Sequence, residues 1–235
     1  MKLQLPTVTL LIVDCVNADM AKKVVDICKS KVDFGDIKLL THLPIDSEYK
    51  VEIVPLKTLV AYSIFMLTKC HEYINTSHVL VVQLDGFILN PESFNYDWLS
   101  LDYISPLFVQ YDKVGSGGFS LRSKALMQNV SANMPKWDGT QRHADYIQSQ
   151  LGYYEDGVIC LSNKFKHFKF ATPEQAAMFA QGGNKNPTYY RDRPFGFHRT
   201  HQVIDFTTGL IDSSDTERQM TNNYDNEINT LYKLL

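Results

Sequence analysis

Val79-Leu80-Val81-Val82-Gln83-Leu84-Asp85-Gly86 is the stretch that decides the fold, because an apolar run ends abruptly in an acid and a glycine. Such a run is typical of a strand covered on both faces within a parallel sheet. Open α/β sheets bind ligands at the carboxyl ends of their strands, which is where Asp85 falls. Gly86 permits a sharp turn and the close approach of a ligand. The same residues are equally compatible with a strand that ends in a solvated aspartate within a turn.

The composition indicates an ordinary soluble globular protein. The chain has 235 residues, of which 44% are hydrophobic and 21% are charged. Its formal net charge of −3 argues against coating nucleic acid or a membrane by bulk electrostatics. No apolar run is long enough to span a bilayer, and the run at 7–13 lacks the features of a secretory signal. The four cysteines are far apart, which argues against a zinc site and fits reduced thiols. We therefore expect a cytoplasmic protein without a membrane span.

Strand and helix signals alternate along the first half of the chain. Strands are expected at 7–13, 37–41, 51–54 and 79–83, and helices at 17–30, capped by Asn17, and 59–74. This alternation predicts an α/β fold with a mostly parallel sheet and helices on both faces.

The second half of the chain is less regular. Strands are expected at 103–105 and 117–121, and helices after 123 and at 143–151, 157–162 and 173–180. We find no internal repeat or linker. The sequence therefore predicts one domain over residues 1–200 and a polar C-terminal extension over 201–235, which is helical or partly disordered.

Acids and glycines stand at several expected ends of strands and helices. Asp14 follows the first strand, where a carboxylate can bind a base or a ribose, although alone it is better explained as a helix-entry residue. Gly117 and Gly118 open a strand, which is typical either of close backbone approach or of a plain loop or bulge. Glu155 and Asp156 precede an apolar segment. Acids in the first turn of a helix also complement its dipole without any further role.

Phe195-Gly196-Phe197-His198 indicates a short strand that presents an imidazole late in the chain. A neutral imidazole is a common ligand of borderline metals, whereas a lone histidine is more often structural or solvated.

In this order, the motifs resemble those of GT-A-fold glycosyltransferases. They are most similar to a bacterial and phage family of glycosyltransferase-like proteins named as a domain of unknown function. The resemblance runs from about Thr7 to His198, and several motifs agree in order and spacing. It is carried by Tyr73-Ile74, His78–Gly86 with Leu89-Asn90-Pro91, Gly117–Ser123, Glu155-Asp156 and Phe195–His198.

The resemblance implies sugar transfer from a nucleotide-sugar, in the first place a UDP-sugar, to an acceptor hydroxyl. Asp85 matches the last acid of the family's Asp-X-Asp motif and His198 its late histidine. Together they would hold Mn²⁺ or Mg²⁺ against the leaving diphosphate. Gln83 stands where the motif has its first acid. It brings no charge, so metal binding is expected to be weak or to require the donor.

The resemblance also implies roles for the glycines and the paired acids. Asp156 matches the catalytic base of inverting enzymes, and Glu155 is the second candidate, which could instead fix the loop or bind an acceptor hydroxyl. Gly117 and Gly118 would line the junction of donor and acceptor. Asp14 would lie beside the nucleotide base or ribose, completing a donor site with Gln83 and Asp85.

The acceptor is left open by the sequence, as a glycan or a modified DNA base. The segment 164–169 interleaves basic and aromatic residues, which can bind nucleic acid or can form an exposed strand whose aromatic residues face the core. Tyr62 and Ser63 could join the donor pocket, although ordinary helix packing is the simpler interpretation.

Three alternatives remain beside an inverting transferase. Gln83 in place of an acid is compatible with a non-catalytic nucleotide- or glycan-binding protein on the same fold. A nucleotidyltransferase is disfavoured, because no glycine-rich basic loop follows the first strand. Some retaining enzymes share the GT-A fold, so the stereochemical course also stays open.

Overall fold

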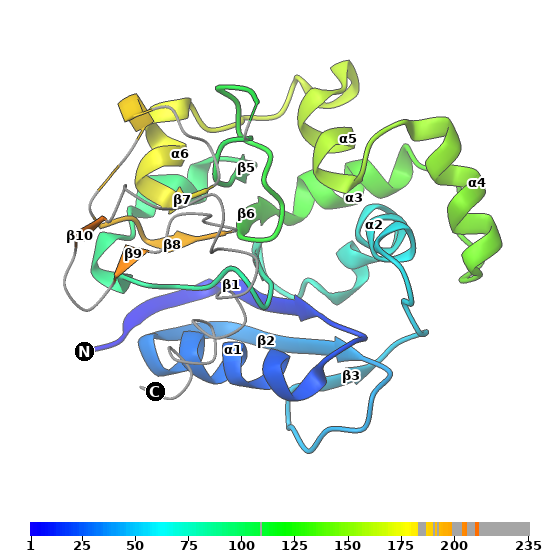
Figure 1. Ribbon diagram of the computed structural model, residues 1–235, viewed down its shortest axis with the longest axis horizontal. Helices are drawn as coiled ribbons and strands as arrows, with labels where there is room; N and C mark the ends of the chain where they lie inside the picture. Colours follow the sequence, from blue (N-terminus) through cyan, green and yellow to red (C-terminus); the bar gives the residue numbers. More distant parts are fainter. Residues whose placement is uncertain are drawn as a thin grey trace.

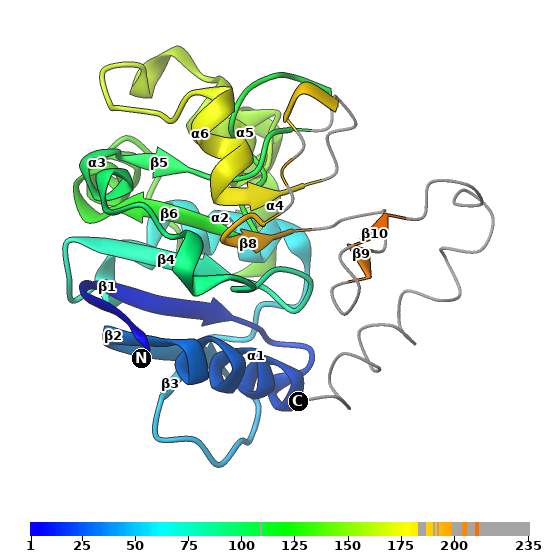
Figure 2. The same cartoon turned by 90° about the vertical axis from the view of Figure 1, so that its left-hand side faces the viewer.

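The computed structural model describes residues 1–108, 110–182, 187–189, 191 and 193–198, together with the backbone of 204–205 and 210–211. A six-stranded sheet in the order β3-β2-β1-β4-β6-β5 forms its centre (Figure 1). Figure 2 shows these strands stacked from β3 at the bottom to β5 at the top. The strands are β1 (Leu3–Val13), β2 (Val32–Thr41), β3 (Lys50–Glu52), β4 (His78–Val82), β5 (Tyr103–Ile104) and β6 (Ser120–Ser123).

The sheet is parallel over most of its width and antiparallel at one side. The pairs β3–β2, β2–β1 and β1–β4 are parallel, whereas β6 runs antiparallel to both β4 and β5. The expectation of a mostly parallel α/β sheet is confirmed. In the β1–β4 pair, Ile12 lies opposite Val82, so both strands end at the same edge. This edge receives the residues that follow β1 and β4.

Helices cover both faces of the sheet. Their bounds are α1 (Ala18–Lys31), α2 (Leu59–Thr68), α3 (Lys124–Ala132), α4 (Gln141–Leu151), α5 (Glu155–Leu161) and α6 (Pro173–Phe179). In Figure 2, α1 lies in front of the sheet and α2 behind it. Because successive strand residues point to opposite faces, the consecutive burial of Val8 to Val13 requires cover on both sides.

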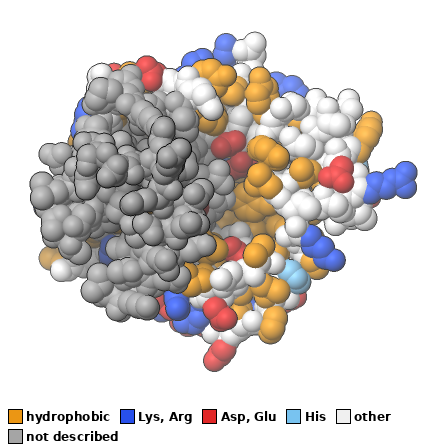
Figure 3. Space-filling view, viewed as in Figure 1, with side chains coloured by type: hydrophobic (Ala, Val, Ile, Leu, Met, Phe, Trp, Pro, Cys, Tyr) orange, Lys and Arg blue, Asp and Glu red, His pale blue; other side chains and the backbone are white. Residues whose placement is uncertain are grey.

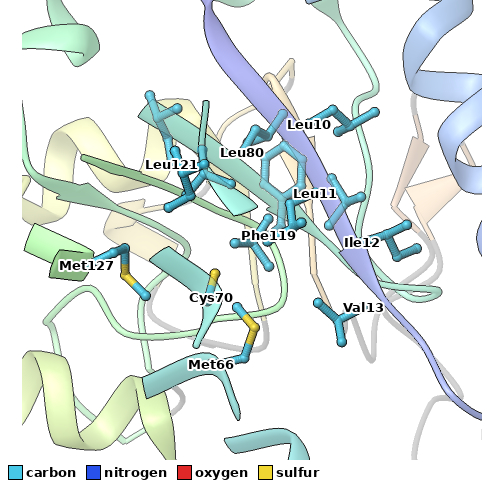
Figure 4. Close-up of a cluster of buried hydrophobic side chains, with 14 of the residues drawn as sticks. Leu10, Leu11, Ile12, Val13, Met66, Cys70, Leu80, Phe119, Leu121 and Met127 are labelled. Carbon is cyan, nitrogen blue, oxygen red and sulfur yellow. The ribbon is translucent and has the colours of Figure 1, made fainter. Parts of the chain in front are cut away.

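The core is continuous from the sheet into the helices behind it. Figure 4 shows a cluster of buried apolar side chains contributed by β1, β4, β6, α2, α3 and neighbouring turns. Its labelled members are Leu10, Leu11, Ile12, Val13, Met66, Cys70, Leu80, Phe119, Leu121 and Met127. Burial of this apolar surface is the main force that holds β4 and β6, and hence the loops at their ends, in place.

Local sequence signals account for several helix starts. The side chain of Asn17 accepts a hydrogen bond from the amide of Met20, as expected for the cap of α1. Thr58 and Ser123 cap α2 and α3 in the same way. α6 begins with a capping box between Thr172 and Gln175.

Three local expectations need correction. The helix expected over 59–74 ends at Thr68, because Lys69 leaves the helical region (φ −124°), and a 3₁₀ turn, Cys70–Tyr73, follows. The strand expected to begin at Gly117 begins at Ser120, since the glycines form the preceding turn. Residues 164–169 form no strand. A 3₁₀ turn, Asn163–Phe165, occupies the start of that segment and buries Phe165.

The late strand expected near His198 is confirmed. β8 (Gly196–Phe197) pairs in parallel with β7 (Ala180–Gln181). The C-terminal extension lies outside the described residues, apart from the antiparallel pair of β9 (Ile204–Asp205) and β10 (Leu210–Ile211). Within the described part of the chain, no helix is both long and apolar enough to cross a membrane.

Candidate active site

The carboxyl end of β4 makes a tight turn that presents Asp85. The backbone amide of Gln83 donates to the carbonyl of Gly86 and the amide of Gly86 donates back, both at 3.1 Å. Asp85 therefore lies at the tip of a two-residue turn, and 21% of its side chain is exposed. A Cβ on Gly86 would come within 2.9 Å of the carbonyl oxygen of Phe197, so this position requires glycine.

His198 reaches the same place from β8, 115 residues further along the chain from Gln83. Its backbone amide donates to the carbonyl of Gln181, and its side chain is almost fully buried. The Nε2 atom lies 3.5 Å from Oδ1 of Asp85 and 3.3 Å from Oε1 of Gln83. The Nδ1 atom lies 2.7 Å from Oγ of Ser116. The fold therefore brings together the three residues expected to face the donor diphosphate.

The donor atoms of this cluster fit a divalent cation in kind but are few in number. Asp85 offers a carboxylate, His198 an imidazole and Gln83 an amide oxygen, which suit Mg²⁺ or Mn²⁺. The Ser116 hydroxyl on Nδ1 would orient the imidazole, as partners of ligating histidines do. Across the described residues, no group of three or more His, Cys, Asp or Glu side chains is placed to hold a metal. A cation here would take its remaining ligands from water or from a bound diphosphate.

Gly117 and Gly118 join this cluster to the paired acids. A Cβ on Gly118 would lie 2.1 Å from Nε2 of His198 and 2.3 Å from Oε1 of Gln83. A Cβ on Gly117 would lie 2.4 Å from Oε1 of Glu155. Real Cβ atoms are not found so close to other atoms, so neither glycine can carry a side chain without displacing a neighbour. Gly117 thus lies against the paired acids, and Gly118 lies against the cluster of His198 and Gln83.

Glu155 is bound to a buried arginine. Nη2 of Arg122 lies 2.9 Å from Oε1 of Glu155, with side-chain exposures of 0% and 7%. Oε2 of Glu155 accepts the backbone amide of Asp156 at 2.7 Å. Both carboxylate oxygens of Glu155 are therefore engaged within the protein.

Asp156 lies beside the glycine turn and is partly exposed. Its Oδ1 accepts the amide of Gly157 at 2.7 Å, and its Oδ2 accepts the amide of Gly117 at 3.3 Å. Burial, followed by the negative charge of Glu155, raises the pKa of Asp156 to about 6. A carboxyl group with this pKa can exchange a proton near neutral pH, which is the property required of a general base.

Asp14 lies at the same edge of the sheet, one strand away. Its Oδ1 accepts the backbone amides of Val16 and Asn17 at 2.8 and 2.6 Å. These bonds hold the turn between β1 and α1, as the helix-entry interpretation predicts. Both of these bonds use the same carboxylate oxygen. Binding of a ribose or base by Asp14 stays a prediction.

Two similarities relate the chain to known proteins. Residues 48–198 match the family described as "Protein of unknown function (DUF5672)". The chain belongs to this family. No curated protein matches the sequence. Among solved structures, the galactosyltransferase LgtC in complex with donor and acceptor sugar analogs is similar, with a TM-score of 0.53 and 12% identity. The match covers 97% of this chain and 96% of that one. The DUF5672 chain thus has a GT-A-like α/β fold.

Four residues of this DUF5672 protein were given no role by its sequence or only an incomplete one. The sequence indicates Ser120 and Arg122 only as parts of the motif Gly117–Ser123, and it gives no signal for Ser116. Ser120 and Arg122 alternate along β6 and so share a face. The available signal was an arginine directly after the strand expected at 117–121. Tyr62 was attributed to helix packing, but its hydroxyl accepts a hydrogen bond from Nε2 of Gln83 at 2.9 Å.

The surface of the DUF5672 protein gives little support for nucleic-acid binding. On the face shown in Figure 3, acidic side chains lie among apolar ones, and the described residues form no continuous basic patch there. In the basic-aromatic segment, Phe165 is buried and Phe168 packs against the core. The Phe165 ring is therefore not available for stacking on bases, and the Phe168 ring is partly covered by the core.

Proposed function

We propose that this chain is a glycosyltransferase that moves a sugar from a nucleotide-sugar donor to an acceptor hydroxyl with inversion of configuration. The observation that carries the proposal is the position of Gly117 and Gly118 between the two groups of polar residues. It sets Asp156 on one side and the cluster of Gln83, Asp85 and His198 on the other. A donor whose diphosphate meets that cluster would have its anomeric carbon near the glycines, where no side chain obstructs the acceptor.

Asp156 is the general base of the proposed reaction. As the acceptor oxygen forms its bond to the anomeric carbon, the hydroxyl proton passes to the carboxylate of Asp156. The bond between the anomeric carbon and the phosphate oxygen breaks on the opposite side, and the nucleoside diphosphate leaves with the electron pair. The two hydrogen bonds from the amides of Gly117 and Gly157 keep the carboxylate in place for this step.

Asp85 and His198 orient the donor diphosphate, and Gln83 assists through its amide oxygen. A bound Mn²⁺ or Mg²⁺ at these residues would neutralise the negative charge that develops on the leaving group. Because Gln83 is neutral, the cluster carries a single carboxylate. Donor and cation are therefore expected to bind together more tightly than either alone. In this proposal Asp14, which lies at the same sheet edge, contacts the base or the ribose.

The acceptor class favoured here is a glycan, and a modified DNA base is the less supported choice. The two core-packed rings of the segment at 164–169 remove the main sequence argument for base stacking. A UDP-sugar is the donor to test first, and the sugar is to be named by experiment.

The test is hydrolysis and binding of a panel of nucleotide-sugars, with and without Mn²⁺, for the wild type and Asp156→Asn. We expect slow Mn²⁺-stimulated hydrolysis of one donor, lost in the variant while donor binding is kept. Undiminished hydrolysis by Asp156→Asn would refute the assigned base. Equal donor affinity in Asp85→Ala, His198→Ala and the wild type would refute the shared site.

A second candidate, a non-catalytic nucleotide- or glycan-binding protein, is favoured by one observation. Gln83 replaces an acid and donates to the hydroxyl of Tyr62, so the cluster has less charge than a strong metal site requires. Donor binding without turnover on any acceptor would support this candidate, whereas multiple turnovers would exclude it.

A further inference from the structure

Arg122 is the buried charge that the proposed chemistry does not use. It lies on β6, its side chain is fully buried, and its guanidinium carbon lies 5.4 Å from the centre of the Tyr103 ring. Burial of an arginine is costly unless its charge and its hydrogen bonds are matched. The groups that accept hydrogen bonds from the guanidinium should therefore indicate its role.

The guanidinium closes a ring of hydrogen bonds around the glycine turn and the paired acids. Nη2 of Arg122 donates to the carbonyl of Gly117 at 3.0 Å and to Oε1 of Glu155 at 2.9 Å. Oε2 of Glu155 accepts the amide of Asp156, and Oδ2 of Asp156 accepts the amide of Gly117. The hydrogen bonds thus run from Arg122 through Glu155, Asp156 and Gly117 back to Arg122. Every link joins residues of the proposed catalytic centre.

Ser120 sets the angle of the guanidinium within this ring. Its hydroxyl donates to the carbonyl of Gly117 at 2.8 Å and accepts Nε of Arg122 at the same distance. Ser120 and Arg122 project from the same face of β6, which is paired on both sides by β4 and β5, so the backbone from which the guanidinium extends is fixed. Nε and Nη2 belong to one planar group, so the guanidinium holds the Ser120 hydroxyl, the Gly117 carbonyl and the Glu155 carboxylate in a fixed relative geometry.

We propose that Arg122 is the positioning residue of this site. It fixes Glu155 and the carbonyl of Gly117, and through them it sets the place of the Asp156 carboxylate relative to the glycine turn. Glu155 is accordingly a second positioning residue and is not the general base. This inference rests on the proposed function, since it names what prepares Asp156 for that reaction.

The test separates positioning from stability by using a paired substitution. Arg122→Met alone should lower the unfolding temperature, because it leaves the charge of Glu155 buried without its partner. The double variant Arg122→Met/Glu155→Met removes both charges and should recover most of that loss. If the ring positions the base, this variant should still lose roughly tenfold or more in kcat for donor hydrolysis, with KM changed less than about threefold.

A matched control is available at the other end of β4. His78 is buried, and its ring contacts Ser77 and the carbonyl of Leu101, away from the glycine turn. His78→Gln should lower the unfolding temperature without changing kcat. Turnover by the double variant within about twofold of the wild type would overturn the positioning role.

A second readout does not depend on activity or on the double variant. The amide of Gly117 donates to Asp156, so its proton chemical shift should follow the titration of that carboxyl group. In Glu155→Gln, which retains the size of the side chain, we expect a pH-dependent change of smaller amplitude. The glutamine has one acceptor oxygen and cannot accept from both Arg122 and the Asp156 amide. An unchanged titration in Glu155→Gln and in Ser120→Ala would overturn the proposal.

These two readouts distinguish the possible failures. If the wild type turns over no donor but the Gly117 amide behaves as expected, the proposed function is wrong and the positioning of Asp156 by Arg122 stands. If donor turnover is found and the double variant retains it, the function stands and the positioning role is wrong.

Discussion

Nη2 of Arg122 lies 2.9 Å from Oε1 of Glu155, in a pair that is almost completely removed from solvent. The pair explains why two adjacent acids with similar chemistry have different surroundings. Glu155 is held on both oxygens by the protein, whereas Asp156 faces the glycine turn and remains partly exposed. The neighbouring charge of Glu155 contributes to the raised pKa of Asp156.

The first prediction concerns the pH dependence of turnover. A general base must be ionised, so kcat/KM for the donor should rise with pH with a midpoint near the Asp156 pKa of about 6. Asp156→Asn should lower kcat by about 10²–10⁴-fold and abolish this rise, as measured by initial rates from pH 4.5 to 8. A wild-type profile that is flat between pH 5 and 7 would contradict the assignment.

The second prediction concerns stability at the same residue. The folded-state pKa of Asp156 is raised, so its favourable contribution is complete below about pH 4 and is lost as the pH rises through about 6. Asp156→Asn removes that loss. Above pH 6, the variant should be more stable than the wild type by about 1–2 kcal/mol. This figure allows for the hydrogen bond from Gly117 that the amide nitrogen of asparagine cannot accept. Denaturant unfolding at pH 4 and pH 7 measures the difference, and a variant less stable at pH 7 would contradict the prediction.

The third prediction concerns Gly118. Gly118→Ala would place a Cβ 2.1 Å from Nε2 of His198 and 2.3 Å from Oε1 of Gln83. We expect donor affinity to fall at least about tenfold, because the side chains of His198 and Gln83 must move to make room for the new Cβ atom. The matched control is Gly139→Ala, which carries backbone strain (φ +88°) but has only Val54 within 4.0 Å. The control should lose roughly 1 kcal/mol of stability and retain donor affinity.

The fourth prediction concerns the missing acid. Gln83→Glu adds a carboxylate of the same size, and the hydroxyl of Tyr62 can donate to it in place of the present bond. Affinity for Mn²⁺ should rise about tenfold or more, because a second charge joins Asp85 at the cluster. Titration of Mn²⁺ followed by electron paramagnetic resonance measures this. Unchanged affinity would show that position 83 does not face the cation.

The fifth prediction concerns the orientation of His198. Ser116→Ala removes the hydroxyl 2.7 Å from Nδ1. Loss of a partner that orients a ligating histidine typically weakens metal binding by about 10–100-fold. We therefore expect weaker Mn²⁺-dependent donor binding by calorimetry, with Mn²⁺-independent binding unchanged. A loss of equal size without Mn²⁺ would show that Ser116 acts on the donor directly.

The sequence by itself determined the class of fold and most of the element positions. Period and capping were sufficient for α1, whose start at Asn17 is encoded within four residues. The apolar run before Gln83 likewise predicted β4, because burial on both faces leaves a continuous hydrophobic signature. Local signals were weaker near the glycines. There, Gly117 and Gly118 have no side chain to reveal whether they begin a strand or precede one.

Only the tertiary structure decided which of the candidate residues meet and what each one contacts. His198 reaches Gln83 across 115 residues through the pairing of β7 and β8, which no local pattern encodes. The distinction between Glu155 and Asp156 depends on Arg122, which lies on β6, an antiparallel strand between β4 and β5. Local propensities act over a few residues, whereas electrostatic partners are chosen by the packing of distant elements. The sequence was therefore sufficient to identify Glu155 and Asp156 as candidates, and the fold determined which groups surround each of them.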